Sequence, residues 1–182
     1  MDARRRIMND SSKKYSKKQI VCFVLGLAAF AAGFGILTFF GVRKICRDVH
    51  RHKLMKENIV VEIPELDIKA PVLEGTELSV LAEGAGHFIG TGSVGKGNFC
   101  IAAHSSVIYK EYFNNLKNVR NGMDIVLYDV DKNASHYAVS DYFYVQPSET
   151  WVLDDKGDDR VTLITCSDDG SQRLVVVGLL KE

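Results

Sequence analysis

The pattern of apolar and polar positions divides the chain into two unlike parts. Residues 20–42 form an apolar run of 23 residues without a charged side chain, and Thr38 is the one polar side chain in it. At about 1.5 Å of rise per residue, a helix of this length spans roughly 35 Å, enough to cross a bilayer core of about 30 Å. The pattern predicts a membrane-spanning helix over residues 20–42.

A cleaved signal peptide is the alternative interpretation of this run. Ala29-Phe30-Ala31 supplies the small-x-small pattern of a cleavage site. The apolar residues continue for eleven positions past Ala31, however, which is too long for the apolar region of a typical signal peptide. The length of the run therefore favours a retained span.

Basic residues flank the span on both sides. Residues 1–19 carry seven Lys and Arg side chains and residues 43–57 carry six, so the positive-inside rule hardly distinguishes the two orientations. The short leading segment and the long following one favour a cytoplasmic tail at 1–19 and an exported C-terminal part. Residues 43–57 are interpreted as a basic juxtamembrane linker that either lies near anionic lipid or acts as a solvated spacer.

From residue 58 onward the pattern changes to short apolar runs separated by turn signals. Most runs are rich in Val, Ile, Leu, Tyr and Phe, as strands are. The predicted strands are Ile59–Ile63, Ile68–Leu73, Phe99–Ala103, Asp124–Tyr128, His136–Val145, Val161–Thr165 and Leu174–Leu180. Thr76–Glu83 and Lys110–Asn118 each predict a helical turn or two. Residues 58–182 are predicted to be an all-β domain, either a closed barrel or a sandwich.

Charge and cysteine usage narrow the function classes. The whole chain has no net charge, but residues 1–57 hold 13 basic and 4 acidic side chains (+9), whereas residues 58–182 hold 10 basic and 19 acidic ones (−9). A domain with that negative charge lacks the basic surface that nucleic-acid binding requires. The four cysteines, at positions 22, 46, 100 and 166, form no CxxC motif, so neither a structural zinc site nor a disulfide framework is expected.

Three side chains at predicted strand ends are candidates for chemistry. Cys166 ends an apolar run before a polar loop, His104 follows two alanines at the end of another run, and Arg173 opens the last strand. Each has a structural alternative: a buried thiol, a hydrogen-bonded histidine and a surface arginine. Together they supply a nucleophile, a group for general acid–base catalysis and a donor for a developing oxyanion. A tight hairpin between the last two strands would place Cys166 and Arg173 on facing strand ends.

These residues also stand in recognisable motifs. Thr162-Leu163-Ile164-Thr165-Cys166 matches the TLxTC signature of the sortases, the cysteine transpeptidases of the Gram-positive cell surface. Ala103-His104 and the Arg173-Leu174-Val175-Val176-Val177-Gly178 strand have counterparts in that family, as does the entry segment Ile63–Ile68. The resemblance covers about residues 59–182, and an N-terminal anchor fits it as well.

The resemblance implies a closed eight-stranded β-barrel with short helical turns and a reaction in two stages. Cys166 would attack the Thr carbonyl of an LPxTG-like sorting signal, cleave the Thr–Gly bond and form a thioacyl-enzyme. An amine of peptidoglycan precursor or of a pilin Lys would then take the acyl group. His104 would be the general acid and base, Arg173 would hold the peptide and stabilise the oxyanion, and Thr165 would contribute through its backbone or hydroxyl. The expected partners are sorting-signal-bearing surface proteins, the amine acceptor and the bilayer of the plasma membrane, which a single-pass anchor would cross.

The resemblance leans towards the class A-like members, and no cofactor is expected to be required. Carboxylates around Gly157 are weak candidates for Ca²⁺, which some sortases use, but their spacing is not that of an EF-hand and a solvated acidic loop is the alternative. These residues are Asp154, Asp155, Asp158 and Asp159. The link of six residues from Cys166 to Arg173 is short, so the preferred sorting signal is open.

Two other functions remain open beside the transpeptidase. A cysteine protease would use the same residues but transfer the acyl group to water. A non-catalytic anchored β module would bind peptide or wall polymer and would not need the Cys166 thiol. A papain-type protease is excluded by chain order, because its Cys precedes its His.

Overall fold

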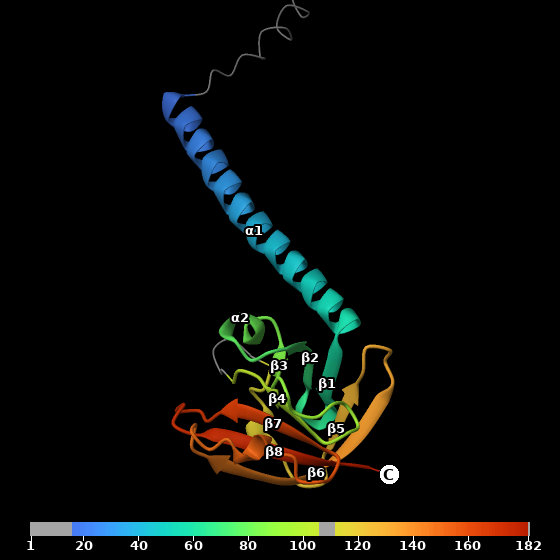
Figure 1. Ribbon diagram of the computed structural model, residues 1–182. Helices are drawn as coiled ribbons and strands as arrows, with labels where there is room; N and C mark the ends of the chain where they lie inside the picture. The colour runs from blue at the N-terminus through green and yellow to red at the C-terminus, as the bar shows by residue number, and fades with distance from the viewer. Residues whose placement is uncertain (1–15, 106–111, 182) are drawn as a thin grey trace, which may run out of the picture. The chain divides into compact units, whose positions relative to one another are not determined.

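The computed structural model describes residues 16–105 and 112–181 (Figure 1). The chain divides into two compact units, Met1–Asp48 and Val49–Glu182. Among the described residues, the first unit contains most of a long helix, and the second contains the end of that helix and the strands.

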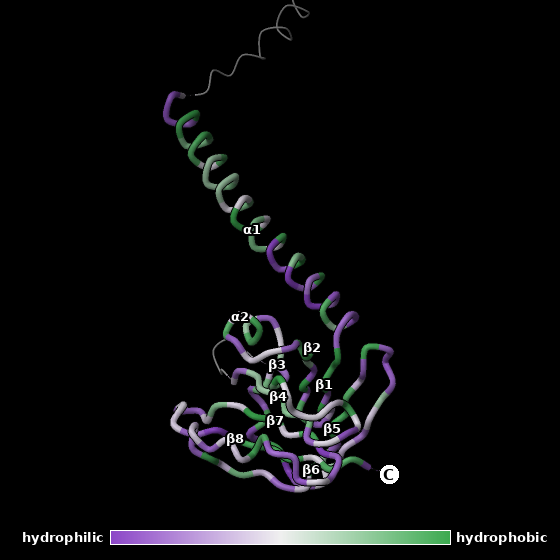
Figure 2. Tube along the Cα trace, viewed as in Figure 1, coloured by the Kyte–Doolittle hydropathy of each residue, from purple (hydrophilic) through white to green (hydrophobic). Residues whose placement is uncertain are grey.

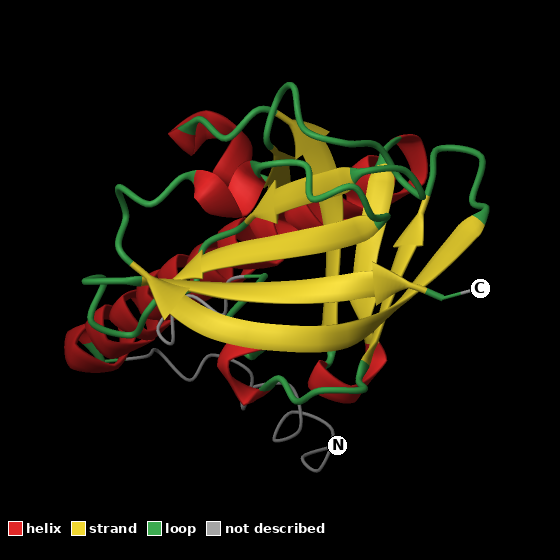
Figure 3. Ribbon diagram, turned by 60° about the horizontal axis from the view of Figure 1, so that its bottom comes forward, coloured by secondary structure: helices red, strands yellow, loops and turns green. Residues whose placement is uncertain are grey.

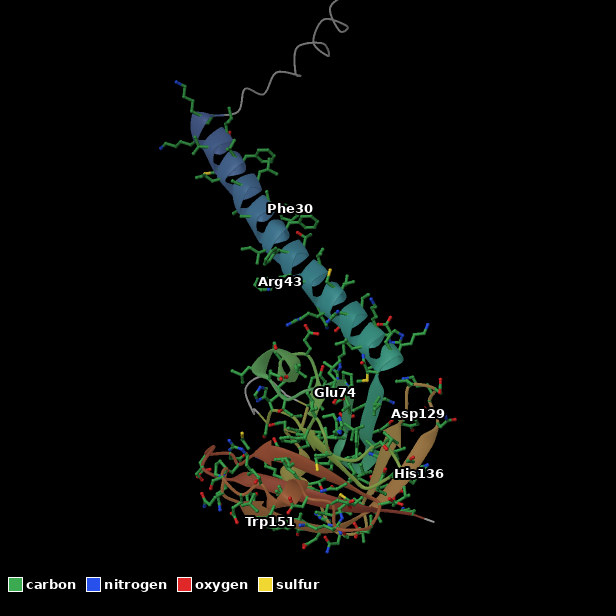
Figure 4. All side chains as sticks on the ribbon, in the orientation of Figure 1. Phe30, Arg43, Glu74, Asp129, His136 and Trp151 are labelled. Atoms are coloured by element: carbon green, nitrogen blue, oxygen red, sulfur yellow. The ribbon has the colours of Figure 1, made fainter. Side chains whose placement is uncertain are left out.

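Helix α1 runs without interruption from Lys17 to Glu57 and has no buried residue. After a hydrophilic first turn the helix is apolar, and its last part is hydrophilic again (Figure 2). The side chains of Phe30, in the apolar part, and Arg43, in the hydrophilic last part, project outward from the helix (Figure 4). Thr38 Oγ1 donates to the carbonyls of Phe34 at 3.0 Å and Gly35 at 2.9 Å, so the polar group of the apolar part is satisfied within the helix. Within the described residues, α1 is the one helix long and apolar enough to cross a membrane.

The second unit is a closed β-barrel of eight strands (Figure 3). Around the barrel the order is β1-β2-β3-β4-β7-β8-β6-β5. The strands are β1 (Ile59–Ile63), β2 (Ile68–Glu74), β3 (Ala85–His87), β4 (Asn98–Ala102), β5 (Asp124–Tyr128), β6 (Ala134–Val145), β7 (Arg160–Cys166) and β8 (Arg173–Leu180). The all-β prediction is confirmed, and the closed order decides between the barrel and the sandwich.

Two of the eight strand contacts are parallel, and one of them positions the candidate site. Strand β2 pairs with β3 in parallel and β4 pairs with β7 in parallel, whereas the other contacts are antiparallel. Because parallel neighbours point the same way, the C-terminal ends of β4 and β7 meet at one end of the barrel. Both His104 and Cys166 lie at this end.

Strands β7 and β8 are apolar on both faces, because each face packs against a separate cluster. Leu163, Leu174 and Val176 belong to the main core inside the barrel. Ile164, Val175 and Val177 belong to a second cluster on the outer face, with Val145 and Val152. Burial on both sides explains why the sequence of these strands reads as a continuous apolar run and not as an alternation.

Short helical turns connect the strands, as predicted. These are η1 (Pro64–Leu66), α2 (Leu78–Leu81), η2 (Leu116–Asn118) and η3 (Trp151–Leu153). Helix α2 lies within the predicted Thr76–Glu83 segment. Turn η2 lies within the predicted Lys110–Asn118 segment, of which residues 110 and 111 are outside the described residues. Turn η3 buries Val152 in the outer-face cluster, so the connection from β6 to β7 packs over that face.

Candidate active site

Cys166 is the last residue of β7 and Arg173 is the first residue of β8, and the two are paired directly across the antiparallel ladder. Ile164 and Val175 are also cross-strand partners, two residues inward along each strand from Cys166 and Arg173, and they lie on the outer face of the barrel. Side chains alternate along a strand, so Cys166 and Arg173 point to this outer face as well. The expectation that a tight hairpin places them on facing strand ends is confirmed.

His104 reaches the same level through the parallel contact between β4 and β7. Ala102 is the partner of Ile164, and the Ala103 N–H donates to the Ile164 carbonyl at 3.1 Å. His104 and Cys166 each come two residues after these partners, so the two strands deliver them to the same level at the barrel end. The His104 carbonyl accepts a bond from the Phe113 N–H at 3.1 Å, which anchors the backbone at this position.

Thr165 connects the two segments that carry His104 and Cys166. Its hydroxyl donates to the Ala103 carbonyl at 2.8 Å, and the residue is 4% exposed. The bond joins the residue before the thiol to the residue before the imidazole. A buried hydroxyl in such a bond fixes the spacing of the two strand ends, because its loss would leave a carbonyl without a partner.

The loop from Ser167 to Gln172 is closed by its own hydrogen bonds. The Ser167 N–H donates to the Gln172 carbonyl at 3.0 Å, and the Gln172 N–H donates to Ser167 Oγ at 3.0 Å. The Asp169 carboxylate accepts from Ser167 Oγ at 2.6 Å and from the N–H and Oγ of Ser171 at 3.0 and 2.8 Å. These hydrogen bonds, of which the bond from Ser167 Oγ has the largest effect, lower the pKa of Asp169 to about 2. The short link is therefore a defined turn that carries a permanent negative charge.

Arg173 turns one nitrogen of its guanidinium toward this loop. Its Nη1 donates to the carbonyls of Gln172 at 3.2 Å and of Gly170 at 3.4 Å. A guanidinium has five N–H donors on three nitrogens, so contacts through one nitrogen leave the other two for a substrate carbonyl or an oxyanion. The loop thus orients the Arg173 side chain without occupying all of its hydrogen-bond donors.

A pocket of about 260 Å³ opens beside the Cys166 thiol. Its charged side chains come from separate elements: Lys117 from η2, and Asp168 and Asp169 from the loop after β7. Lys117 Nζ forms an ion pair with Asp168 Oδ2 at 2.9 Å. The residues that line the pocket are Ser105, Lys117, Tyr144, Thr165, Cys166, Ser167, Asp168, Asp169 and Leu174.

The four aspartates suggested as weak calcium ligands face different partners. Asp154 is paired with Lys156 at 3.4 Å, Asp158 is paired with Arg160, and Asp155 Oδ1 accepts from the Gly157 N–H at 2.9 Å. The fourth, Asp159, accepts from the Gly97 N–H at 2.8 Å. Across residues 16–105 and 112–181, no group of three or more His, Cys, Asp or Glu side chains is placed to hold a metal ion. The expectation that no cofactor is required, with these aspartates as weak candidates for Ca²⁺, stays a prediction.

The other thiol of the barrel is placed differently from Cys166. Cys100 is 0% exposed, and burial raises its pKa to about 11, although hydrogen bonds from Thr91 and Thr162 act in the opposite direction. Both cysteines are free thiols. Only Cys166, which is half-buried, lines the pocket, so it is the thiol of the barrel that a substrate can reach.

Trp151 covers part of the outer face. It is 46% exposed, and its ring stacks on Phe143 with centroids 5.6 Å apart and planes 9° apart. Phe143 packs against the second apolar cluster. The indole, labelled in Figure 4, therefore lies over the edge of that cluster.

The pocket contains residues that the sequence did not single out. Lys117 is 51 residues from Asp168 in the chain, and Tyr144 lies on another strand, so no local pattern connects them with Cys166. The signal present in the sequence is the acidic Asp168-Asp169 pair, one residue after the TLxTC segment. From the sequence alone, this segment is predicted only to be a polar loop after Cys166.

A half-buried cysteine opposite an arginine and beside a histidine, at the end of a closed barrel, has the groups that cysteine-dependent acyl transfer requires. Comparison with known proteins specifies this class. The family model described as Sortase domain matches residues 61–181. Sortase A of Bacillus anthracis is 33% identical over 135 residues, which cover 72% of this chain and 64% of that relative. Sortase A of Staphylococcus aureus is 35% identical over 112 residues, which cover 59% of this chain and 54% of that relative.

Solved structures agree with this assignment. The Listeria monocytogenes sortase A structure superposes with a TM-score of 0.65 at 29% identity, covering 70% of this chain and 88% of that one. The pilus-related Sortase C of Group B Streptococcus gives a TM-score of 0.63 at 29% identity, covering 70% of this chain and 68% of that one. The chain belongs to the sortase family, whose members are cysteine transpeptidases. It spans between about half and two thirds of the length of the curated relatives it matches.

Proposed function

We propose that this chain is a membrane-anchored cysteine transpeptidase that joins sorting-signal-bearing surface proteins to an amine. The observation that carries the proposal is the direct pairing of Cys166 with Arg173, with His104 delivered to the same level by the parallel β4–β7 contact. The names of the curated relatives and the leaning of the motifs favour a class A-like member. Helix α1 would anchor the chain with its N-terminus in the cytoplasm and the barrel outside the plasma membrane.

The first stage cleaves a sorting signal of the LPxTG type between Thr and Gly. The Cys166 thiolate attacks the Thr carbonyl carbon, and the electron pair of the carbonyl moves onto its oxygen. His104 as imidazolium protonates the Gly nitrogen as the C–N bond breaks. A thioacyl-enzyme and a free Gly amine result, and His104 is left neutral.

Arg173 stabilises the oxyanion of this stage. As the cross-strand neighbour of Cys166, it presents N–H donors to the oxygen of the carbon that the sulfur has attacked. The apolar residues of the sorting signal would lie on the outer face, where Phe88, Phe143 and Leu153 pack half-buried against the second cluster. Thr165 donates its hydroxyl proton to Ala103, so its role in this proposal is to hold the two strand ends together.

In the second stage an amine of peptidoglycan precursor or of a pilin Lys attacks the thioacyl carbon. Its nitrogen replaces sulfur, the amide forms, and Cys166 leaves as thiolate while His104 accepts a proton. A cysteine protease would complete the same cycle with water. The two functions differ only in the product of this stage.

The test uses the 182-residue chain in detergent micelles with LPxTG-like peptides, with and without triglycine amide or a Lys peptide. Mass spectrometry should detect a cut after Thr, a thioacyl adduct on Cys166 and an amine-linked product. Cys166→Ala should abolish all three, whereas Cys46→Ala, which removes an exposed thiol outside the barrel, should retain them. Cleavage with water as the sole acceptor for every amine would indicate the protease. Lack of any adduct on Cys166 would favour the non-catalytic peptide-binding module.

A further inference from the structure

Cys166 lies between two surfaces of different character. Ile164 and Val175, beside it on the outer face, belong to the apolar cluster. Thr165 and Leu174 are paired with each other and point inward, and Leu174 is part of the main core. The pocket at the barrel end is lined by these inward residues together with polar loop residues. The thiol therefore has an apolar cluster on one side and a pocket with charged side chains on the other.

A transpeptidase binds two substrates at one thiol, and the second arrives after the first has been attached. An extended apolar peptide matches the outer face. The pocket with charged side chains remains for the other substrate, which brings an amine that is protonated at neutral pH. Its described lining carries two carboxylates, Asp168 and Asp169, and one cation, Lys117, so its net charge is −1. The bonds that hold Asp169 ionised keep the charge of this carboxylate at any physiological pH.

The Lys117–Asp168 ion pair is exposed enough for another cation to replace Lys117. Its side chains are 40% and 62% exposed, and both bonds, at 2.9 and 3.1 Å, use the same ammonium. Exposed ion pairs of this kind contribute little to stability because solvent screens them. An incoming ammonium can therefore take the place of Lys117 on Asp168 at small cost.

We propose that this pocket is the binding site for the acceptor amine, an inference that rests on the proposed transpeptidase function. Asp168 and Asp169 attract the protonated amine, and Lys117 competes with it for Asp168. The acceptor enters with three N–H bonds. One proton goes to solvent as the amine leaves the carboxylates, and one goes to neutral His104 as nitrogen attacks the thioacyl carbon. The third stays on the amide, the C–S bond breaks, and Cys166 recovers its thiolate opposite protonated His104.

This arrangement predicts opposite effects from the two halves of one ion pair. Asp168→Asn takes the pocket from −1 to neutral and should raise the KM for triglycine amide by roughly three- to five-fold, the size expected for one screened charge. Lys117→Met takes the pocket from −1 to −2 and removes the competitor, so it should lower that KM by a similar factor. Both differences should shrink at high ionic strength.

The measurement follows amine-linked product against triglycine amide concentration with the 182-residue chain in micelles. Each variant is normalised to its own rate of peptide cleavage without amine. Hydroxylamine, which is largely uncharged at neutral pH, serves as the neutral acceptor, and its KM should not follow the charge of the pocket. Glu62→Gln and Lys69→Met break a comparable ion pair at 2.7 Å between β1 and β2 and should leave the KM for both acceptors unchanged. Asp168→Glu should restore the wild-type value.

The outcomes separate this inference from the function on which it rests. Opposite shifts for Asp168→Asn and Lys117→Met, confined to the charged acceptor, support the acceptor site. Shifts in the same direction would show that the pair is a structural link between η2 and the loop, and unchanged values would place the acceptor elsewhere; either result overturns the inference while cleavage continues. A wild-type chain that cuts no sorting signal overturns the proposed function, and the acceptor site with it.

Discussion

Cys166 and Arg173 are direct cross-strand neighbours at the ends of β7 and β8, and the Ser167–Gln172 turn that joins them is closed by a backbone bond of 3.0 Å. Opposed residues in an antiparallel ladder have Cβ atoms about 5 Å apart. The Arg173 side chain can therefore reach the carbonyl oxygen of a substrate whose carbonyl carbon is attacked by the Cys166 sulfur. The guanidinium and the thiol act on one reacting group because the ladder fixes their register.

The first prediction concerns this pair. Arg173→Gln should lower kcat/KM for peptide cleavage by about 10²–10³, the usual cost of removing an oxyanion donor. Arg173→Lys should recover part of the loss, because Lys keeps the charge but lacks the planar set of donors. Steady-state cleavage of a fluorogenic sorting-signal peptide measures both.

Arg160→Lys is the matched control for Arg173, since Arg160 lies at the opposite end of β7 and pairs with Asp158. It should cleave the peptide at the wild-type rate. An Arg173→Gln variant with wild-type kcat/KM would contradict the role assigned to the guanidinium.

Thr165 carries the second prediction. Thr165→Val keeps the shape of the side chain but leaves the Ala103 carbonyl without its 2.8 Å partner. The free energy of unfolding should fall by about 1–3 kcal/mol, the cost of an unsatisfied buried group. Thr165→Ser, which keeps the hydroxyl, should lose less, and Thr150→Val at an exposed position should lose almost nothing. Urea unfolding followed by circular dichroism measures these differences.

Much of the barrel was predictable because its strands are long enough to carry an apolar pattern. Seven predicted strands overlap observed ones, and β1 and β5 have the predicted bounds. Strand β3 was not predicted, because Ala85, Gly86 and His87 are three residues without an apolar run. Its place in the barrel depends on backbone bonds, such as that from the Gly75 N–H to the His87 carbonyl at 3.0 Å.

The candidate site was predictable where chemistry sits at strand ends, and not where it depends on distant loops. The hairpin made the Cys166–Arg173 relationship local in sequence. The neighbourhood of His104 and Cys166 came from the resemblance, because a parallel contact between β4 and β7 leaves no local signal. The ion pair of Lys117 with Asp168 could not be predicted from the sequence, since η2 and the loop after β7 are brought together only by the closed barrel.

The third prediction concerns Gly86. A Cβ at this position would lie 2.2 Å from the Gly75 carbonyl oxygen, a backbone atom that cannot move away alone. Gly86→Ala should therefore separate the β2–β3 connection from β3 and destabilise the barrel by at least the ~1–3 kcal/mol typical of overpacking. Thermal unfolding measures the loss. Gly90→Asn is the control, because nothing lies within 4 Å of its Cβ position and Asn tolerates its φ of 87°. Equal stability of the two variants would contradict the close approach.

The fourth prediction separates the two thiols of the barrel. Because burial raises the Cys100 pKa to about 11, its thiolate fraction at pH 8 is very small, and the side chain is inaccessible. Iodoacetamide should modify Cys166 in the folded chain and reach Cys100 only after unfolding, as peptide mass spectrometry would show. A raised pKa stabilises the fold fully below the unfolded pKa near 9, and this contribution should decline as the pH rises toward 11. Cys100→Val should remove this contribution to the loss of stability at alkaline pH. Labelling of Cys100 in the folded chain would contradict its burial.

The fifth prediction concerns the acid limit of the loop beside the thiol. A pKa lowered to about 2 means that the Asp169 carboxylate keeps its bonds to Ser167 and Ser171 at every pH where the protein is assayed. A depressed pKa contributes stability that is present above the unfolded value near 3.8 and is lost as the pH falls through about 2. The carboxyl ¹³C signal of Asp169 should titrate with a midpoint near that value, and the Ser171 amide signal should stay constant from pH 7 to pH 4. Asp169→Asn should remove the pH response of the Ser171 amide below pH 4. A midpoint near 4 in the wild-type chain would mean that the turn is open in solution and that the pocket beside Cys166 loses its negative charge in mild acid.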